Sequence, residues 1–150
     1  MSSRDIRVQH VAASDLIGLI DTTISRGQSF TLTVKGNSMR PFFTHDKTRV
    51  KLAAPLPLRK HDVCLFTCND KVFLHRLIKQ QGETLTFQGD ALGSKETVTL
   101  DDVIAKVVAV IHPHKTVDPR RLSARVGLCL WRMMKPAVRV LKKRRRKRDA

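Results

Sequence analysis

The chain has 150 residues, enough for one domain with a hydrophobic core, and its hydrophobic fraction of 41% is typical of a globular protein. Lys and Arg number 29 against 13 Asp and Glu, which gives a net charge of +16. Its three cysteines, Cys64, Cys68 and Cys129, lack zinc-site spacing, so the composition indicates neither a disulfide framework nor a metal site.

The N-terminal segment predicts a helix from Val11 to Arg26, because its apolar residues recur at helical spacing and Gly27 follows as a stop signal. We assign residues 1–28 to this helical segment. The segment contains neither a secretory signal nor a long apolar stretch, since charged residues such as Asp5 and Asp15 interrupt every candidate. We therefore expect a cytoplasmic protein.

The middle of the chain predicts short strands separated by Pro, Gly, Asn and Asp turns. Many short strands without alternating helices favour a coiled antiparallel sheet or a β-barrel. We therefore expect a mainly β fold, with this core at residues 29–112 and a connector at residues 113–119. The predicted strands are Phe30–Val34, Arg49–Leu52, Val63–Thr67, Val72–Ile78, Leu85–Phe87, Thr97–Leu100 and Ile104–Ile111.

The most informative run, Gly36-Asn37-Ser38-Met39-Arg40-Pro41, follows the first predicted strand. Gly36 can bend the chain and lift Ser38 away from the sheet edge, and Pro41 blocks strand pairing beyond it. A serine hydroxyl presented in this way is a candidate nucleophile. The plainer interpretation is a Ser/Pro/Gly loop between two strands.

A serine nucleophile needs a general base within hydrogen-bond reach, and the base needs a group that orients it. The candidate base is His75, which lies in the apolar run Val72–Ile78; an ordinary core histidine is the alternative. Downstream, Asp90 in the Gly89-Asp90 corner can accept the second ring N–H of His75 and fix its tautomer. These residues predict a serine peptidase site.

Three motifs occur in the order Gly36–Pro41, His61–Phe66 leading to His75–Ile78, and Gly89-Asp90. In this order they resemble the type I signal peptidase family, whose clan includes the self-cleaving SOS and phage repressors. The likeness is to its endoplasmic-reticulum and archaeal branch, which uses Ser-His where the bacterial enzymes use Ser-Lys. It implies a mostly β peptidase with Ser38 as nucleophile, His75 as general base, no cofactor and no metal, acting on a peptide or protein with small side chains before the cut. The resemblance covers residues 29–110.

The third member of the site stays open at this point. In the family, a further acidic pair follows the Gly-Asp pair, and the corresponding stretch here is Gly93-Ser94-Lys95-Glu96. Either Asp90 or Glu96 can therefore orient His75, with Asp101 or Asp102 as more distant options.

The resemblance has one departure at the serine motif itself. Many family members carry a hydroxyl side chain two residues before the nucleophile that helps to bind the oxyanion, whereas this chain has Gly36. We therefore expect the oxyanion and substrate region, around Gly36, Asn37 and Met39, to rely on backbone N–H groups, starting with that of Ser38.

Positive charge is concentrated beyond residue 118. Residues 119–150 contain 13 Lys and Arg and one acidic residue, against 16 and 12 in residues 1–118. The pattern predicts a basic amphipathic helix and polybasic tail over residues 120–150, kinked or split at Pro136. Such a segment suits an anionic membrane surface and not a bilayer span. The residues expected to contact the membrane or another acidic partner are Arg121, Arg125, Trp131, Arg132, Arg139, Lys142, Lys143 and Arg144.

Together these features predict a signal peptidase-like serine endopeptidase, peripheral to the inner membrane face, that cleaves a leader or signal-type peptide through an acyl-enzyme. One alternative is a catalytically silent peptide-binding or regulatory relative of the same fold. Another is a relative of the self-cleaving repressors, which would need an N-terminal DNA-binding domain. For the tail, the alternatives are docking on the core and binding of nucleic acid.

Overall fold

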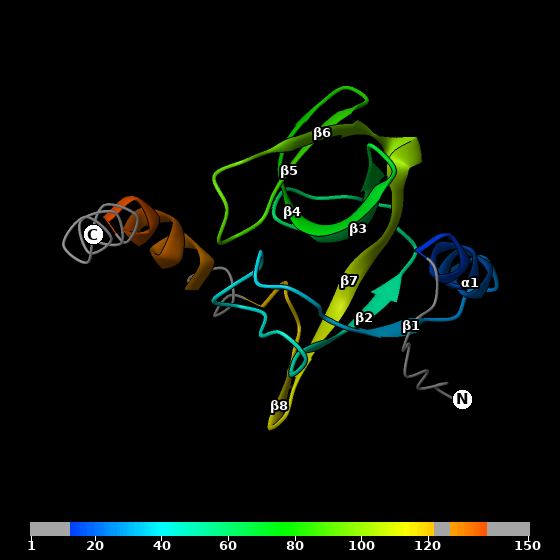
Figure 1. Cartoon of the computed structure of the whole chain (residues 1–150), viewed down its shortest axis with the longest axis horizontal. Coiled ribbons are helices and arrows are strands. Elements are labelled where there is room, and N and C mark those ends of the chain that lie inside the picture. The colour runs from blue at the N-terminus through cyan, green and yellow to red at the C-terminus, as the bar shows by residue number, and fades with distance from the viewer. Residues whose placement is uncertain (1–12, 122–126, 138–150) are drawn as a thin grey trace, which may run out of the picture. The chain divides into compact units, whose positions relative to one another are not determined.

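Figure 1 shows the computed structural model of the chain, which describes residues 13–121 and 127–137. Two compact units divide the chain, Met1–Val117 and Asp118–Ala150. The described residues of the first unit form helix α1 followed by eight strands, with one 3₁₀ turn, η1, between β6 and β7. The bounds are α1 Ala13–Ser25, β1 Phe30–Thr33, β2 Arg49–Ala53, β3 Val63–Cys68, β4 Lys71–Gln81, β5 Thr84–Gln88, β6 Glu96–Thr99, η1 Leu100–Asp102, β7 Val103–His112 and β8 Lys115–Val117.

The eight strands form one antiparallel sheet in the order β1-β2-β7-β3-β4-β5-β6, with β8 paired to β7. Strand β7 pairs with both β2 and β3 and so joins the two halves of the sheet, as Figure 1 shows. The expected mainly β fold with a coiled antiparallel sheet and two terminal helices is confirmed. The described strands do not close into a barrel, because β1 and β6 remain the two ends of the strand order.

Strand β3 is buried on both faces, which explains its unbroken apolar sequence. Val63 and Leu65 face one core cluster, whereas Cys64 and Phe66 face a second cluster on the opposite side. The first cluster includes Ile20 of α1, and the second is built mainly by β3, β4, β5 and β6. The curled half of the sheet therefore has its own interior.

Helix α1 packs against the first cluster through its apolar stripe. Ile20 is fully buried, and Leu16 and Ile24 pack beside it. Gly27 ends the helix with φ +71° and donates its N–H to the Ile24 carbonyl at 2.9 Å. The segment assigned to residues 1–28 thus belongs to the same compact unit as the sheet, through its described part.

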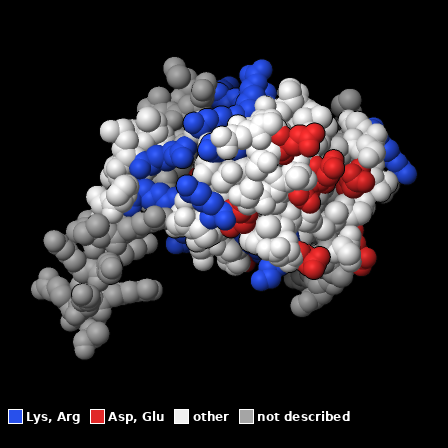
Figure 2. Space-filling view, turned by 90° about the horizontal axis from the view of Figure 1, so that it is seen from above, with Lys and Arg blue, Asp and Glu red and all other residues white. Residues whose placement is uncertain are grey.

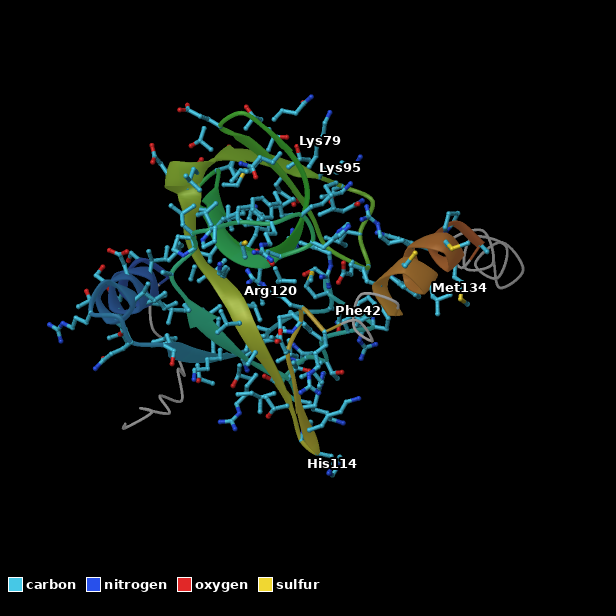
Figure 3. All side chains as sticks on the ribbon, turned by 180° about the vertical axis from the view of Figure 1, so that it is seen from behind. Phe42, Lys79, Lys95, His114, Arg120 and Met134 are labelled. Carbon is cyan, nitrogen blue, oxygen red and sulfur yellow. The ribbon has the colours of Figure 1, made fainter. Side chains whose placement is uncertain are left out.

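The hairpin after β7 is the largest difference from the predicted elements. Residues 113–119 were expected to form a connector, but Lys115–Val117 forms β8, with His112 paired to Lys115. His114 lies at the tip of this hairpin (Figure 3). A three-residue strand is too short to show an alternating pattern, which is why the sequence did not reveal it.

In the second unit, residues 127–137 are helical. The helix continues through Pro136, so the described segment is not split there as one expectation held. Leu130, Met133 and Met134 on this helix are exposed, and Figure 3 shows Met134 on its surface. None of the described helices is long and apolar enough to cross a membrane.

Candidate active site

Ser38 lies in the loop between β1 and β2, and this loop is closed at its base. The Val34 N–H donates to the Thr48 carbonyl at 2.8 Å, next to the end of β1. Beyond Ser38, Met39 and Phe43 are buried at 2% and 3% exposure, and the Phe43 N–H donates to the Met39 carbonyl at 3.0 Å. The half-buried Ser38 is therefore fixed by an anchored turn directly after it.

His75 lies on β4, on the face that points into the curled half of the sheet. Its ring centroid is 5.3 Å from that of Phe73 and 6.2 Å from that of Phe66. The side chain is 3% exposed, and its Nδ1 lies 2.8 Å from Oε2 of Glu96, the first residue of β6. The structure thus pairs the candidate base with a carboxylate, and that carboxylate is Glu96.

The turn after β5 brings Ser38 and His75 to one place. The Ala91 N–H donates to the Ser38 carbonyl at 2.8 Å. A Cβ atom at Gly89 would lie 2.8 Å from that same carbonyl oxygen and 3.1 Å from His75 Nε2. The Ser38 carbonyl oxygen and His75 Nε2 therefore both lie close to Gly89, where a larger side chain would clash. This explains on steric grounds why the Gly-Asp motif has glycine at this position.

The second ring nitrogen of His75 remains open. Nε2 has no hydrogen-bond partner among the described residues, and no described side-chain nitrogen or oxygen is both unpaired and sealed from solvent. Nε2 therefore keeps contact with solvent. A ring nitrogen in contact with solvent can bind water, so its missing protein partner is compatible with a general base and with an ordinary core histidine.

The Ser38 hydroxyl also makes no hydrogen bond within the described part of the chain, including none to His75. Hydrogen bonds between nucleophile and base are often long in enzymes without substrate and shorten in the complex. The described contacts therefore bring the Ser38 backbone carbonyl and His75 Nε2 to one corner, with no hydrogen bond between the hydroxyl and the imidazole.

The expectation that Asp90 accepts the second ring N–H of His75 is wrong in this structure. Both carboxylate oxygens of Asp90 instead accept from Arg76, with Nε to Oδ1 at 2.8 Å and Nη2 to Oδ2 at 2.7 Å. Arg76 follows His75 on β4 and so points to the opposite face of the strand. Glu96, the alternative acid, takes the position beside the imidazole.

The two more distant acidic candidates, Asp101 and Asp102, lie in η1 and form no hydrogen bond with His75. Asp102 accepts from the Thr99 N–H at 2.9 Å and from the Thr99 hydroxyl at 3.0 Å, and so caps η1. Asp101 belongs to the same exposed turn. Neither is hydrogen-bonded to the imidazole, whose Nδ1 pairs with Glu96.

The region expected to bind an oxyanion consists of backbone around the serine. Gly36 has φ +85°, and its N–H is already hydrogen-bonded, because it donates to His45 Nδ1 at 2.8 Å. The N–H groups of Ser38 and Met39 donate to no described residue. The Ser38 N–H is therefore available for an oxyanion, whereas that of Gly36 serves to hold the turn; Asn37 is exposed beside them.

Sequence reasoning missed two residues that shape the site, Arg76 and His45. A charged side chain inside a buried strand needs a partner, so the presence of Arg76 in an apolar run was a signal for a buried carboxylate nearby. His45 carried no such signal, because its contact with Gly36 depends on the fold of the loop.

The residues predicted for a membrane or acidic partner are only partly described. Arg121 and Arg132 are exposed, and Trp131 is half-buried. Arg125, Arg139, Lys142, Lys143 and Arg144 lie outside the described residues, and their roles stay predictions. Within residues 13–121 and 127–137, no cluster of His, Cys, Asp and Glu has the arrangement of a metal site.

No family model matches this chain, and no curated protein is significantly similar to it in sequence. The functional interpretation therefore depends on the residues and on the geometry of the corner formed by Ser38, His75, Gly89 and Glu96.

Proposed function

We propose that the protein is a serine endopeptidase of the signal peptidase type, with Ser38 as nucleophile, His75 as general base and Glu96 as the carboxylate that orients the base. The observation that carries the proposal is the state of His75. Its Nδ1 is paired with Glu96 at 2.8 Å, while its Nε2 is open at the corner where Ser38 lies. This is the division of roles that serine catalysis requires of an imidazole.

In the proposed reaction, His75 Nε2 takes the hydroxyl proton of Ser38 as the oxygen attacks a peptide carbonyl. The Ser38 N–H stabilises the negative charge on the carbonyl oxygen. The imidazolium then returns its proton to the leaving amine, which breaks the peptide bond and leaves an acyl-enzyme. Water, deprotonated by His75, hydrolyses this ester and restores the Ser38 hydroxyl.

Glu96 acts on the base and not on the substrate. A carboxylate is only an acceptor, so its contact with Nδ1 requires the proton of the neutral ring to lie on Nδ1. Nε2 is then the lone-pair nitrogen, which is the form a general base needs. The half-buried Glu96, with a side chain 14% exposed, also stabilises the imidazolium formed during the reaction.

The substrate class follows from the motif resemblance, which implies a leader or signal-type peptide with small side chains before the cut. The C-terminal segment supports action at an anionic membrane surface. Its described helix exposes Leu130, Met133 and Met134, and residues 119–150 carry 13 of the 29 Lys and Arg. Figure 2 shows both acidic and basic side chains among the described residues on the face in view.

The direct test is mass spectrometry of a peptide pool rich in small residues, incubated with the wild type, Ser38→Ala and His75→Ala. Each protein is assayed with and without vesicles that contain anionic lipid. Cleavage by the wild type alone would support the peptidase and give its specificity. If all three proteins leave the pool intact, the silent peptide-binding alternative replaces it.

Membrane association has its own test in vesicle flotation. We expect the protein to float with anionic vesicles at low salt and to be released at high salt, because Lys and Arg contacts with lipid headgroups are screened by ions. Neutral vesicles are the control. Failure to float with anionic vesicles at low salt would remove the membrane surface from the proposal.

A further inference from the structure

A histidine outside the catalytic residues contacts the turn that precedes the nucleophile. Gly36, two residues before Ser38, donates its N–H to Nδ1 of His45 at 2.8 Å. The next backbone hydrogen bond upstream is at Val34, whose carbonyl accepts from the Asp46 N–H at 3.0 Å. His45 thus holds the middle of the short segment between the base of the loop and Ser38.

The chemistry of this contact defines the state of the ring. A backbone N–H can only donate, so Nδ1 of His45 must offer its lone pair, and the proton of the neutral ring lies on Nε2. Nε2 is 2.9 Å from Oδ2 of Asp46, an acceptor that favours a proton there. Asp46 also accepts from Lys35, whose hydrogen bond is the main reason that the pKa of this carboxyl is lowered.

We propose that His45 is a positioning residue for Ser38, an inference that rests on the proposed function of the site. By holding the Gly36 N–H, His45 fixes the turn that enters the Asn37–Ser38 peptide. The N–H of that peptide, like that of Met39, donates to no described residue, and the proposed function assigns it to the oxyanion. Loss of the hydrogen bond between Gly36 and His45 would let the Ser38 N–H change direction, while the buried Met39 keeps the rest of the turn in place.

We expect loss of this hydrogen bond to slow the chemical step more than it weakens substrate binding. The oxyanion forms only as the serine attacks, so a misdirected N–H lowers the rate of the chemical step and leaves ground-state binding nearly unchanged. Loss of one hydrogen bond of ordinary strength corresponds to a decrease of about 5-fold to 10-fold in that rate.

The test compares His45→Ala with His45→Asn in the full chain, with a fluorophosphonate as the probe of the serine. The Asn Oδ1 is as many bonds from the backbone as His Nδ1, so it can accept the Gly36 N–H. Alanine removes the acceptor. The limiting rate of covalent labelling and the half-saturating probe concentration are measured separately, with Ser38→Ala as the unlabelled control.

We expect His45→Ala to lower the limiting rate about 5-fold to 10-fold with an unchanged half-saturating concentration, and His45→Asn to restore the rate. Equal rates in the wild type and His45→Ala would overturn the inference and leave the proposed function in place. Absence of labelling at Ser38 in the wild type would overturn the proposed function, and the inference with it.

A second measurement applies even if His45→Ala folds poorly. Hydrogen exchange of the Gly36 amide, followed by NMR, should be protected in the wild type and in His45→Asn. It should be faster in His45→Gln, whose side-chain oxygen lies one bond further out. If the Gly36 amide exchanges equally fast in the wild type and in His45→Gln, the hydrogen bond does not hold the turn and the inference is wrong.

Discussion

Two neighbouring residues of β4, His75 and Arg76, each pair with a carboxylate, but on opposite faces of the strand and with different results. The Arg76–Asp90 pair is buried, at 9% and 6% side-chain exposure, and is bidentate. His75 pairs with Glu96 through one nitrogen and keeps the other open. A pair with matched donors and acceptors serves structure, whereas a pair with one open atom is suited to chemistry.

The Arg76–Asp90 pair also contacts the loops around the His75–Glu96 pair. Besides Asp90, the Arg76 guanidinium donates Nη1 to the His61 carbonyl at 2.9 Å and lies 5.6 Å from the ring centroid of Phe42, in the serine loop. Asp90 follows Gly89, where the Ser38 carbonyl and His75 Nε2 converge. Arg76 therefore ties together three loops around the candidate active site.

The largest effect on stability is expected from Asp90→Asn. The change leaves the buried Arg76 charge without its carboxylate, and the loss of one partner of a buried pair typically lowers the free energy of unfolding by about 3–5 kcal/mol. Urea denaturation measures it. The matched change on the other face, Glu96→Gln, should lower it by about 1 kcal/mol, because the glutamine amide can still form a hydrogen bond with the imidazole. Similar losses for the two variants would contradict the division of roles.

Among these variants, Glu96→Gln is expected to lower the reaction rate most for a small loss of stability. Glutamine keeps the shape but supplies an amide that can donate to Nδ1, which puts the ring proton on Nε2 and blocks it as a base. We expect kcat for peptide cleavage to fall by about 100-fold, within the range of general-base contributions. Melting curves check that the variant is folded. Wild-type kcat in this variant would show that Glu96 does not orient His75.

Gly89→Ala should affect both pairs at once. The new Cβ would lie 2.8 Å from the Ser38 carbonyl oxygen, a backbone atom that cannot move without the loop. We expect a loss of about 1–3 kcal/mol in unfolding free energy, together with loss of cleavage.

The control for that change is Gly18→Ala on α1, where an added Cβ meets nothing within 4 Å. This variant should be slightly more stable, by about 0.5–1 kcal/mol, because alanine favours the helix. If Gly89→Ala were as stable and as active as Gly18→Ala, the convergence at Gly89 would not be a property of the folded protein.

The smallest effect concerns the interior beneath the candidate site. Cys64 pairs with His75 across β3 and β4, and burial raises the pKa of its thiol to about 12. At pH 8 the thiol therefore stays protonated, and iodoacetamide should label the exposed Cys129 but not Cys64. Labelling in urea, where all three cysteines react, is the control. Rapid modification of native Cys64 would mean that the interior around His75 is loosely packed.

The strands were predictable from sequence because their signals are local, and an equally local signal selects Ser38 as a catalytic candidate. Alternating apolar residues mark the strands, and Ser38 lies in a distinctive Gly-to-Pro turn. The choice between Asp90 and Glu96 was not predictable, because both follow β5 within a few residues. The path of the turn from Gly89 to β6 decides it, and this path depends on the Arg76–Asp90 pair across the sheet.

Two further features lie beyond the reach of local patterns. Strand β8 forms because a tight turn at Pro113-His114 returns three residues to β7, and three residues carry no periodicity. The His45–Gly36 contact joins positions nine residues apart through the closed base of the loop. Both depend on tertiary structure that single-sequence patterns do not contain.

The central claim is that His75 activates Ser38, and covalent labelling with a fluorophosphonate followed by peptide mapping tests it most directly. The proteins compared are the wild type, Ser38→Ala and His75→Ala, each shown to be folded by its melting curve. We expect one adduct, on Ser38, in the wild type, none in Ser38→Ala and at most slow labelling in His75→Ala. An unlabelled wild type, an adduct on another residue, or equal labelling rates with and without His75 would contradict this claim.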